Sequence, residues 1–298
     1  MSYCIVVPVY KQKLDCTEEL SLKRLHKIIY EDDRPFHTDD FRDWEERHVY
    51  LICPKGMNTE AYKKIYPSIK VKEFDKKWFK STDTYSQLLI NYNFYKEFDE
   101  YEYMCIYQLD CYIFKDEIGK WCNKGWDYIG GPIISENAGW TEVMKNGVWK
   151  PAVGNGGFSI RKISTFKDIT NPKGEFRQYY KITDELLKNV KFEDKYFCND
   201  IIRFYDLEIP RWQEAYQFAI DMNADIFFNN FKVKDLPVGC HAWPKNIRYW
   251  KNVIKEITPD IVDFCENKYK DFFKLYYNEK NSTLREKDED TALHNSKE

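Results

Sequence analysis

The chain has 298 residues, of which 43% are hydrophobic and 32% charged, so it is too apolar to be disordered as a whole. Its length suits one large α/β domain or two small ones. With 46 basic and 49 acidic residues the net charge is -3, which excludes the strongly basic field that gathers nucleic acid, so no nucleic-acid partner is expected.

The cysteines indicate a reducing compartment. They are odd in number and form no C-x-x-C pair, which fits neither a disulfide framework nor a zinc knuckle: Cys4, Cys16, Cys53, Cys105, Cys111, Cys122, Cys198, Cys240 and Cys265. The first residues lead directly into YCIVVPVY without a basic region or cleavage site, and no run reaches the roughly 18 apolar residues that span a bilayer. We expect a cytoplasmic location, which includes the inner face of the membrane.

Short apolar runs alternate with helical patterns near the start of the chain. Residues 5–9, 48–53 and 103–109 are β-branched or aromatic runs typical of strands. Residues 18–30 and 84–98 place apolar side chains at helical spacing, and each predicts one amphipathic helix. The alternation predicts an α/β fold with a mixed, mostly parallel sheet flanked by helices.

From about residue 125 the composition changes to clusters of Gly, Asn, Pro and Trp, which are typical of loops and short strands. Helical periodicity returns at residues 246–277 and is absent from residues 282–298. We therefore expect one domain over residues 1–245, a helical extension over residues 246–281 and a disordered tail over residues 282–298.

Two segments combine strand patterns with polar or glycine residues. In IYQLDCYIF, residues 106–114, an apolar strand delivers Asp110 at its end, where open sheets bind ligands; a turn or capping aspartate is the alternative. In VGNGGFSIR, residues 153–161, glycines surround Asn155 before a strand-like alternation. This pattern indicates a close backbone approach to a ligand or a glycine-rich hairpin, and it is neither a dinucleotide-binding fingerprint nor a P-loop.

Two later segments carry acids and a histidine. In FEDKYFC, residues 192–198, Glu193 and Asp194 are adjacent, so on a helix one faces a site while the other caps the helix or meets solvent. In PVGCHAW, residues 237–243, His241 is a ligand or a packed core histidine, and the adjacent cysteine does not give zinc-finger spacing.

In this order, the four segments resemble a bacterial glycosyltransferase family catalogued as a domain of unknown function. Its members carry a QxD strand end, a VGNGGFSLR-like segment, an acidic pair and a GCH-W element, and DYIGGP at residues 127–132 is a fifth match. The resemblance spans roughly residues 5–243 and implies a GT-A-like, Rossmann-like fold. It also implies transfer of a sugar from a UDP-linked donor to a hydroxyl of a glycan or lipid-linked glycan acceptor. A general base that faces the donor would invert the anomeric configuration. Such a reaction belongs to the synthesis of bacterial surface polysaccharide or another glycan.

The resemblance also implies roles for single residues. Asp110 matches the second acid of a metal-binding D-x-D, with Gln108 in the place of the first, and His241 matches a further ligand of Mn²⁺ or Mg²⁺. Asp194 or its neighbour Glu193 matches the base that deprotonates the acceptor; Asp194 is our candidate, with Glu193 supporting the site. The residues expected to contact the donor or the acceptor are Pro8, Tyr10, Asp110, Asn155, Gly156 and Gly157.

Other residues stay open between two interpretations. Pro8 and Tyr10 directly follow the first strand and either contact the base and ribose or form a strand-ending turn. Lys11 and Arg161 are phosphate contacts or solvated surface charges. Four tryptophans either stack on sugar rings or pack in the protein: Trp140, Trp149, Trp212 and Trp243.

Two other functions fit parts of the pattern. A nucleotidyltransferase also uses a Rossmann-like sheet and acidic metal ligands, but VVPVYKQ lacks the basic, glycine-rich phosphate loop expected after the first strand. A non-catalytic carbohydrate-binding protein with a degenerate site is the alternative from a different class. Residues 246–257, NIRYWKNVIKEI, form either a helix packed on the core or a peripheral membrane contact.

Overall fold

A computed structural model of the protein describes residues 1–30, 48–132, 143–145, 148–150, 153–221, 224 and 236–268, with the backbone alone at 143–145, 148–150 and 264–266. The chain divides into two compact units, Met1–Val253 and Ile254–Glu298. The second unit contains helix α13 (Pro259–Lys268). Among the described residues, no helix has the length and apolarity needed to cross a bilayer.

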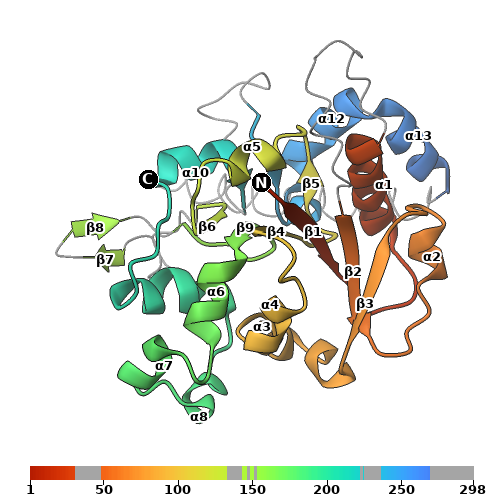
Figure 1. The fold of residues 1–298 in the computed structure, drawn as a ribbon. Coiled ribbons are helices and arrows are strands. Elements are labelled where there is room, and N and C mark those ends of the chain that lie inside the picture. The colour runs from red at the N-terminus through yellow and green to blue at the C-terminus, as the bar shows by residue number, and fades with distance from the viewer. Residues whose placement is uncertain are drawn as a thin grey trace, which may run out of the picture. The chain divides into compact units, whose positions relative to one another are not determined.

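The main sheet of the first unit has the strand order β3-β2-β1-β4-β9-β6 (Figure 1). The four strands β3, β2, β1 and β4 run parallel, whereas β9 is antiparallel to both β4 and β6. Helices lie on both sides of the sheet (Figure 1). The prediction of an α/β fold with a mixed, mostly parallel sheet flanked by helices is confirmed. The strands are β1 (Tyr3–Pro8), β2 (His48–Pro54), β3 (Lys70–Phe74), β4 (Tyr103–Tyr107), β6 (Tyr128–Gly130) and β9 (Phe158–Lys162).

Two smaller sheets complete the strands of the described residues. In one, β10 (Ala219–Ile220) runs parallel to β11 (Gly239–Cys240), which pairs antiparallel with β5 (Tyr112–Ile113). The other is the pair β7 (Val143–Lys145) and β8 (Val148–Lys150). Because β5 follows β4 closely and pairs with β11, the segment around residue 240 lies near the end of β4.

The helices of the first unit correct the sequence prediction in two places. Helical segments occur between residues 163 and 218, where loops and short strands are expected from the sequence. The single helix expected over residues 84–98 is two helices, α3 (Thr82–Leu89) and α4 (Tyr92–Lys96). The break occurs because the Asn91 side chain accepts a hydrogen bond from the backbone N–H of Asn93 at 2.9 Å and so begins a new helix. The other helical segments before α13 are α1 (Cys16–Tyr30), α2 (Glu60–Lys63), η1 (Lys76–Phe79), α5 (Ile118–Cys122), α6 (Ile163–Thr170), α7 (Glu175–Tyr179), α8 (Asp184–Leu187), α9 (Glu193–Lys195), η2 (Tyr196–Asp200), η3 (Ile201–Arg203), α10 (Trp212–Phe218), η5 (Trp243–Asn246) and α12 (Ile247–Ile257).

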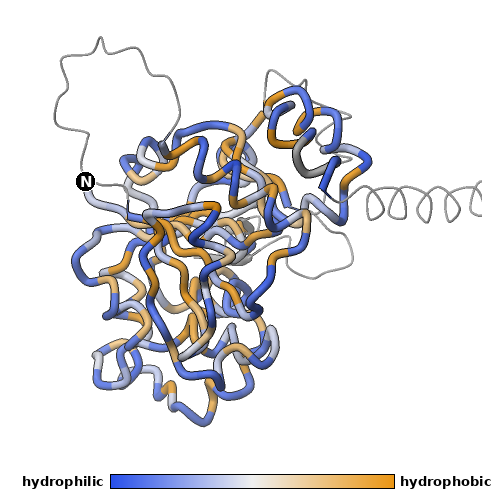
Figure 2. The backbone as a smooth tube through the Cα atoms, turned by 90° about the vertical axis from the view of Figure 1, so that its right-hand side faces the viewer, coloured by the Kyte–Doolittle hydropathy of each residue, from blue (hydrophilic) through white to orange (hydrophobic). Residues whose placement is uncertain are grey.

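The core surrounds the two central strands. Cys4–Val7 of β1 and Met104–Tyr107 of β4 are fully buried, as expected for strands covered on both faces. Figure 2 shows hydrophobic residues, in orange, along the neighbouring strands at the centre of the fold. Each of the eight cysteines whose side chains are described is buried and carries a free thiol.

The first part of α12 packs on the core of the first unit. Ile247, Trp250 and Val253 are buried, and the Trp250 ring stacks on Phe114 with 5.2 Å between ring centroids. The apolar side of this segment is therefore used inside the protein, as in the packed-helix interpretation of residues 246–257.

Candidate functional site

The predicted site residues gather at the edge of the main sheet where β1 and β4 end. Val6 lies opposite Ile106 in the parallel pair β1–β4, so Pro8 and Gln108 follow at the same edge. The antiparallel strand β9 begins there, with Phe158 opposite Tyr107. The N–H of Gln108 donates to the carbonyl of Gly157 at 2.9 Å, which joins the QLD and GNGG segments. This is the edge at which open α/β sheets bind ligands.

Asp110 lies in a turn directly after β4. The strand ends because the N–H of Cys111 turns back to the carbonyl of Gln108 at 2.9 Å. The carbonyl of Asp110 accepts the N–H of Trp243 at 3.1 Å, so the GCHAW segment is attached to this turn. Asp110 therefore lies in a turn that follows the end of β4.

The structure brings Asp110, Gln108 and His241 together. Nε2 of His241 lies 3.2 Å from Oδ1 of Asp110 and 3.3 Å from Oε1 of Gln108. Its other ring nitrogen, Nδ1, lies 2.8 Å from Oδ1 of Asp221 and 2.9 Å from Nδ2 of Asn155. Burial by itself lowers the pKa of His241, but hydrogen bonds to Asp110 and Asp221 and their charges outweigh it and raise the pKa to about 10.

Once Nε2 of His241 has lost its proton, this cluster fits a divalent cation, because cation binding and proton release are coupled at such a ligand. Oδ1 of Asp110 is buried, and Nε2 of His241 lies 3.2 Å from it. Carboxylate and amide oxygens with one imidazole nitrogen suit Mn²⁺ or Mg²⁺. The Cys111 thiol is close to both Asp110 and His241, but it donates to the carbonyl of Gly157 at 3.2 Å. Burial raises the pKa of this thiol well above its usual range.

Glycine is required at positions 156 and 157 by close approach of other side chains. A Cβ at Gly157 would lie 2.3 Å from Nε2 of His241, and a Cβ at Gly156 would lie 2.1 Å from Oε1 of Glu193. Asn155 has a φ of 102°, and its Oδ1 accepts the N–H groups of Gly157 and Phe158 at 3.0 and 3.2 Å. The segment is thus a tight bend that separates His241 on one side from Glu193 on the other.

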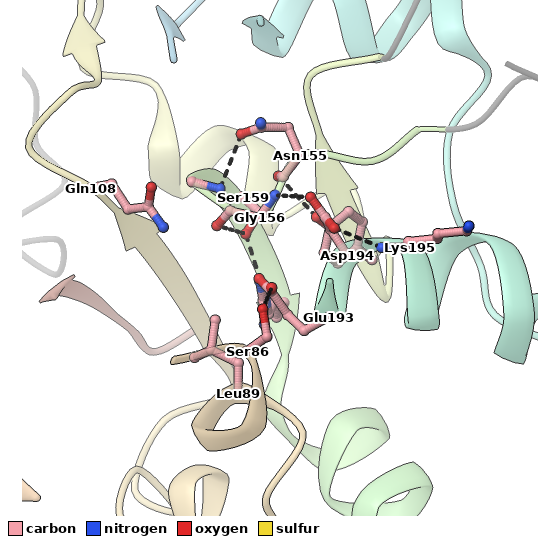
Figure 3. A network of polar contacts seen from close by, with 12 residues as sticks. Ser86, Leu89, Gln108, Asn155, Gly156, Ser159, Glu193, Asp194 and Lys195 are labelled. Carbon is pink, nitrogen blue, oxygen red and sulfur yellow. Dashed lines mark hydrogen bonds and ion pairs between the residues drawn. The ribbon is translucent and has the colours of Figure 1, made fainter. Parts of the chain in front are cut away.

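Asp194 lies beside the first of these glycines (Figure 3). Its Oδ2 accepts the N–H of Gly156 at 3.2 Å, and its Oδ1 accepts the N–H of Lys195 at 2.7 Å. Burial and then the negative charge of Glu193 raise the pKa of Asp194 to about 6, against the lowering effect of the two backbone donors and Arg161. Asp194 is therefore a partly buried carboxylate that titrates close to neutral pH.

Glu193 points into the protein and is held on both oxygens. Its Oε1 pairs with Nη2 of Arg161 at 3.0 Å, and its Oε2 accepts the hydroxyl of Ser86 at 3.0 Å. Arg161 is fully buried and also donates to the hydroxyl of Tyr95 at 3.1 Å. Because Arg161 is fully buried, both sequence interpretations, a phosphate contact and a surface charge, are wrong. The pairing with Glu193 makes this buried charge tolerable.

β1 ends with Pro8, Tyr10 follows it at the same edge, and Tyr10 is 67% exposed. Lys11, in contrast, forms ion pairs with Asp15 and Glu18 at 3.1 and 2.8 Å. An exposed tyrosine at this edge is available to a flat ligand, whereas Lys11 already has two carboxylate partners.

The tryptophans divide between packing and exposure. Trp243 is buried and donates from its indole nitrogen to the Ser21 hydroxyl at 2.9 Å, so it packs inside the protein. Trp212 is 36% exposed. Trp140 and the side chain of Trp149 lie outside the described residues.

Sequence reasoning missed Asp221, which directly follows β10 and contacts His241. The available signal was an acid after a short apolar run, in FAID, twenty positions before His241. A two-residue strand is too short to be recognised by periodicity.

Comparisons with known proteins show what the chain is similar to. No curated protein matches it. Among solved structures, WbbM, a bifunctional glycosyltransferase, aligns over 87% of this chain and 50% of its own with 11% identity and a TM-score of 0.47, so this chain spans half of the WbbM chain. Mouse xyloside xylosyltransferase 1 aligns over 81% and 97% with 9% identity and a TM-score of 0.49. GlyE of Streptococcus pneumoniae TIGR4 aligns over 85% and 62% with 13% identity and a TM-score of 0.45.

The family described as "Protein of unknown function (DUF5672)" matches residues 68–241. The match covers more than half of the chain and includes the QLD, GNGG, FED and GCH segments around which the site is built. The chain therefore belongs to the DUF5672 family.

Proposed function

We propose that this protein is a GT-A-type glycosyltransferase that moves a sugar from a UDP-linked donor to an acceptor hydroxyl. One observation carries the proposal. At the carboxyl edge of the sheet, a donor set for a cation (Asp110, Gln108 and His241) and a carboxylate of raised pKa (Asp194) lie on either side of the Gly156–Gly157 bend. A cation site and a base so close together suit a reaction with an anionic leaving group and a weakly acidic nucleophile.

On the donor side, the diphosphate leaving group carries negative charge that must be stabilised as the glycosidic bond breaks. A bound Mn²⁺ or Mg²⁺ supplies this stabilisation, and Asp110, Gln108 and His241 are the residues that would hold it. The exposed ring of Tyr10, which follows the strand next to β4, supports a contact with the base of the nucleotide.

On the acceptor side, Asp194 removes the proton of the attacking hydroxyl. The acceptor oxygen then forms a bond to the anomeric carbon while the bond from that carbon to the diphosphate oxygen breaks, and the proton remains on the carboxyl of Asp194. Displacement from the face opposite to the leaving group inverts the anomeric configuration. A pKa near 6 leaves Asp194 ionised at neutral pH and still basic enough to accept the proton.

In this proposal Glu193 acts through Asp194 and does not contact the substrate. Its carboxylate is fixed by Arg161 and Ser86, and its charge contributes to the raised pKa of Asp194. We assign the transferase domain to residues 1–245 and a helical extension to the segment from residue 246; residues 269–281 of the expected extension and the expected tail over residues 282–298 lie outside the described residues. We infer that the acceptor is a glycan of bacterial surface polysaccharide synthesis, in line with the sequence resemblance.

The experiment that tests this function is nucleotide binding by the full chain. UDP, GDP, CMP and dTDP are titrated by calorimetry and in thermal unfolding, each with and without Mn²⁺. We expect UDP to bind and to raise the melting temperature, more strongly with Mn²⁺, because a ligand that binds only the folded state stabilises it. Absence of binding by all four nucleotides at millimolar concentration would contradict the proposal.

A further inference from the structure

Asp221 has the geometry of a residue built to hold His241. It directly follows β10, is 9% exposed, and places Oδ1 2.8 Å from Nδ1 of His241. The backbone fixes the same pair of positions, since the N–H of His241 donates to the carbonyl of Ile220 at 2.9 Å. The carboxylate and the ring are thus brought together by the parallel pairing of β10 with β11.

Among the described residues, two groups contact Nδ1 of His241, and of these two Asp221 is the one that can accept its proton. The other is Nδ2 of Asn155 at 2.9 Å, which is a donor. The orientation of that amide is fixed because its Oδ1 already accepts the N–H groups of Gly157 and Phe158. The Nδ1 proton therefore points to Asp221, and Nε2 points to Asp110 and Gln108.

Two glycines leave little room for Asp221 and the ring of His241 to take other positions. A Cβ at Gly131 would lie 3.2 Å from the backbone nitrogen of Asp221 and 3.4 Å from its Cβ, and a Cβ at Gly157 would lie 2.3 Å from Nε2 of His241. The backbone and Cβ of Asp221 and the ring of His241 therefore each lie close to a glycine.

We propose that Asp221 is a positioning residue that presents Nε2 of His241 to a divalent cation held with Asp110. This rests on the proposed function, in which a cation assists departure of the diphosphate. A carboxylate that accepts the far N–H of a ligating histidine fixes its tautomer and ring orientation and makes the ligating nitrogen more basic.

The test is Mn²⁺ binding by the full chain, measured from the electron paramagnetic resonance signal of free Mn²⁺ without nucleotide. Asp221→Ala is expected to weaken binding about 10- to 100-fold, the usual effect of removing such a partner. Asp221→Asn is expected to weaken it less, because its amide oxygen can still accept the Nδ1 proton. Both variants are expected to reach the wild-type Mn²⁺ stoichiometry at higher Mn²⁺, which a damaged fold would not do.

Asp127→Asn is the matched control. Asp127 is 7% exposed and accepts hydrogen bonds from the Thr165 hydroxyl and the N–H of Glu208 at 2.6 and 2.9 Å, so the substitution changes an equally buried, hydrogen-bonded acid. Its Mn²⁺ affinity is expected to equal that of the wild type. Should Asp221→Ala fail to fold, Asp221→Asn carries the comparison.

Three results would overturn the assignment of Asp221: no Mn²⁺ binding by the wild type, wild-type affinity in both Asp221 variants, or an equal loss in Asp127→Asn. The proposed function is tested by separate measurements, namely UDP binding and the release of UDP from UDP-sugars. A protein with the expected Mn²⁺ pattern but without either nucleotide response would contradict the transferase and retain the role of Asp221.

Discussion

Asp194 combines two features that make it useful as a base and costly to the fold. Burial and the charge of Glu193 raise its pKa, while the N–H groups of Gly156 and Lys195 hold its oxygens in place. A carboxylate so placed is ready to accept a proton at neutral pH. It also destabilises the folded protein whenever it is ionised there.

Replacing Asp194 by Asn is expected to remove the base while the nucleotide site stays intact. Turnover should fall about 10²- to 10⁴-fold, the usual contribution of a positioned base, while UDP affinity stays near the wild-type value. The measurement is the rate of UDP release from a UDP-sugar with acceptor. Asp200→Asn, a change to an exposed acid on the neighbouring η2, is the control and should retain wild-type turnover. An Asp194→Asn variant that keeps more than about a tenth of the activity, short of that range, contradicts the assignment.

The pH dependence of turnover follows from the same carboxylate. Because the pKa of Asp194 is raised to about 6, kcat/KM should fall as the pH is lowered through about 6, when the base becomes protonated. The profile is measured at saturating Mn²⁺, so that changes in cation binding do not contribute. An acidic limb near pH 4, the ordinary value for an aspartate, would show that a different, unperturbed carboxylate is the base.

The folded state should be more stable without this carboxylate at neutral pH. The pKa of Asp194 is higher in the folded protein than the ordinary value of 3.8, so its contribution to stability is full below about pH 4 and is lost as the pH rises through about 6. Asp194→Asn should therefore raise the free energy of unfolding at pH 7 by up to about 3 kcal/mol, since two pKa units correspond to roughly that amount. Urea unfolding at pH 4 and pH 7 measures the effect, and a gain that is equal at both values would contradict this origin.

At the scale of elements, the antiparallel pairing of β9 with β4 builds the site. It sets the Gly156–Gly157 bend against the end of β4. His241 lies against Gly157 and Asp194 against Gly156, and the Cα atoms of these two consecutive glycines are about 3.8 Å apart. The apolar runs of β1, β2 and β4 were visible in the sequence because buried parallel strands are almost continuously hydrophobic. The direction and partner of β9 were not, since parallel and antiparallel strands share the same two-residue period.

Arg161 shows the same limit on sequence reasoning. It stands in the alternating stretch GFSIR, where a charged residue suggests solvent, yet it is fully buried because Glu193, from a distant segment, pairs with it. No local pattern contains that partner. The break between α3 and α4 was missed for a different reason, because the apolar spacing continues through the capping residue Asn91.

Gly157→Ala tests the bend. The new Cβ would lie 2.3 Å from Nε2 of His241, so the ring must move away from Asp110 and Gln108. We expect Mn²⁺ affinity to fall about 10-fold or more, as for other disturbances around metal ligands, while binding of UDP without metal changes little. The control is Gly119→Ala in α5, where the nearest atom to the added Cβ belongs to the Tyr3 ring at 3.3 Å. Unchanged Mn²⁺ affinity in Gly157→Ala would contradict the described contact.

At the scale of the whole molecule, the fold collects residues from position 8 to position 241 at one edge of the sheet. Tyr10, Gln108 and Asp110 follow strands of the main sheet, whereas Asp221 and His241 follow strands of the small sheet of β5, β10 and β11. The order of motifs pointed to most of these residues before the structure did. Asp221 was out of reach, because its role depends on the pairing of two strands of two residues each.

The most direct test of the central claim is the release of UDP from a panel of UDP-sugars by the full wild-type chain with Mn²⁺. The account predicts that at least one donor is consumed, by slow hydrolysis without acceptor and faster transfer with a glycan acceptor, and that removal of the cation by a chelator stops the reaction. A chain that binds Mn²⁺ and is folded, but releases no UDP from any donor with or without acceptors, would contradict a glycosyltransferase at this site.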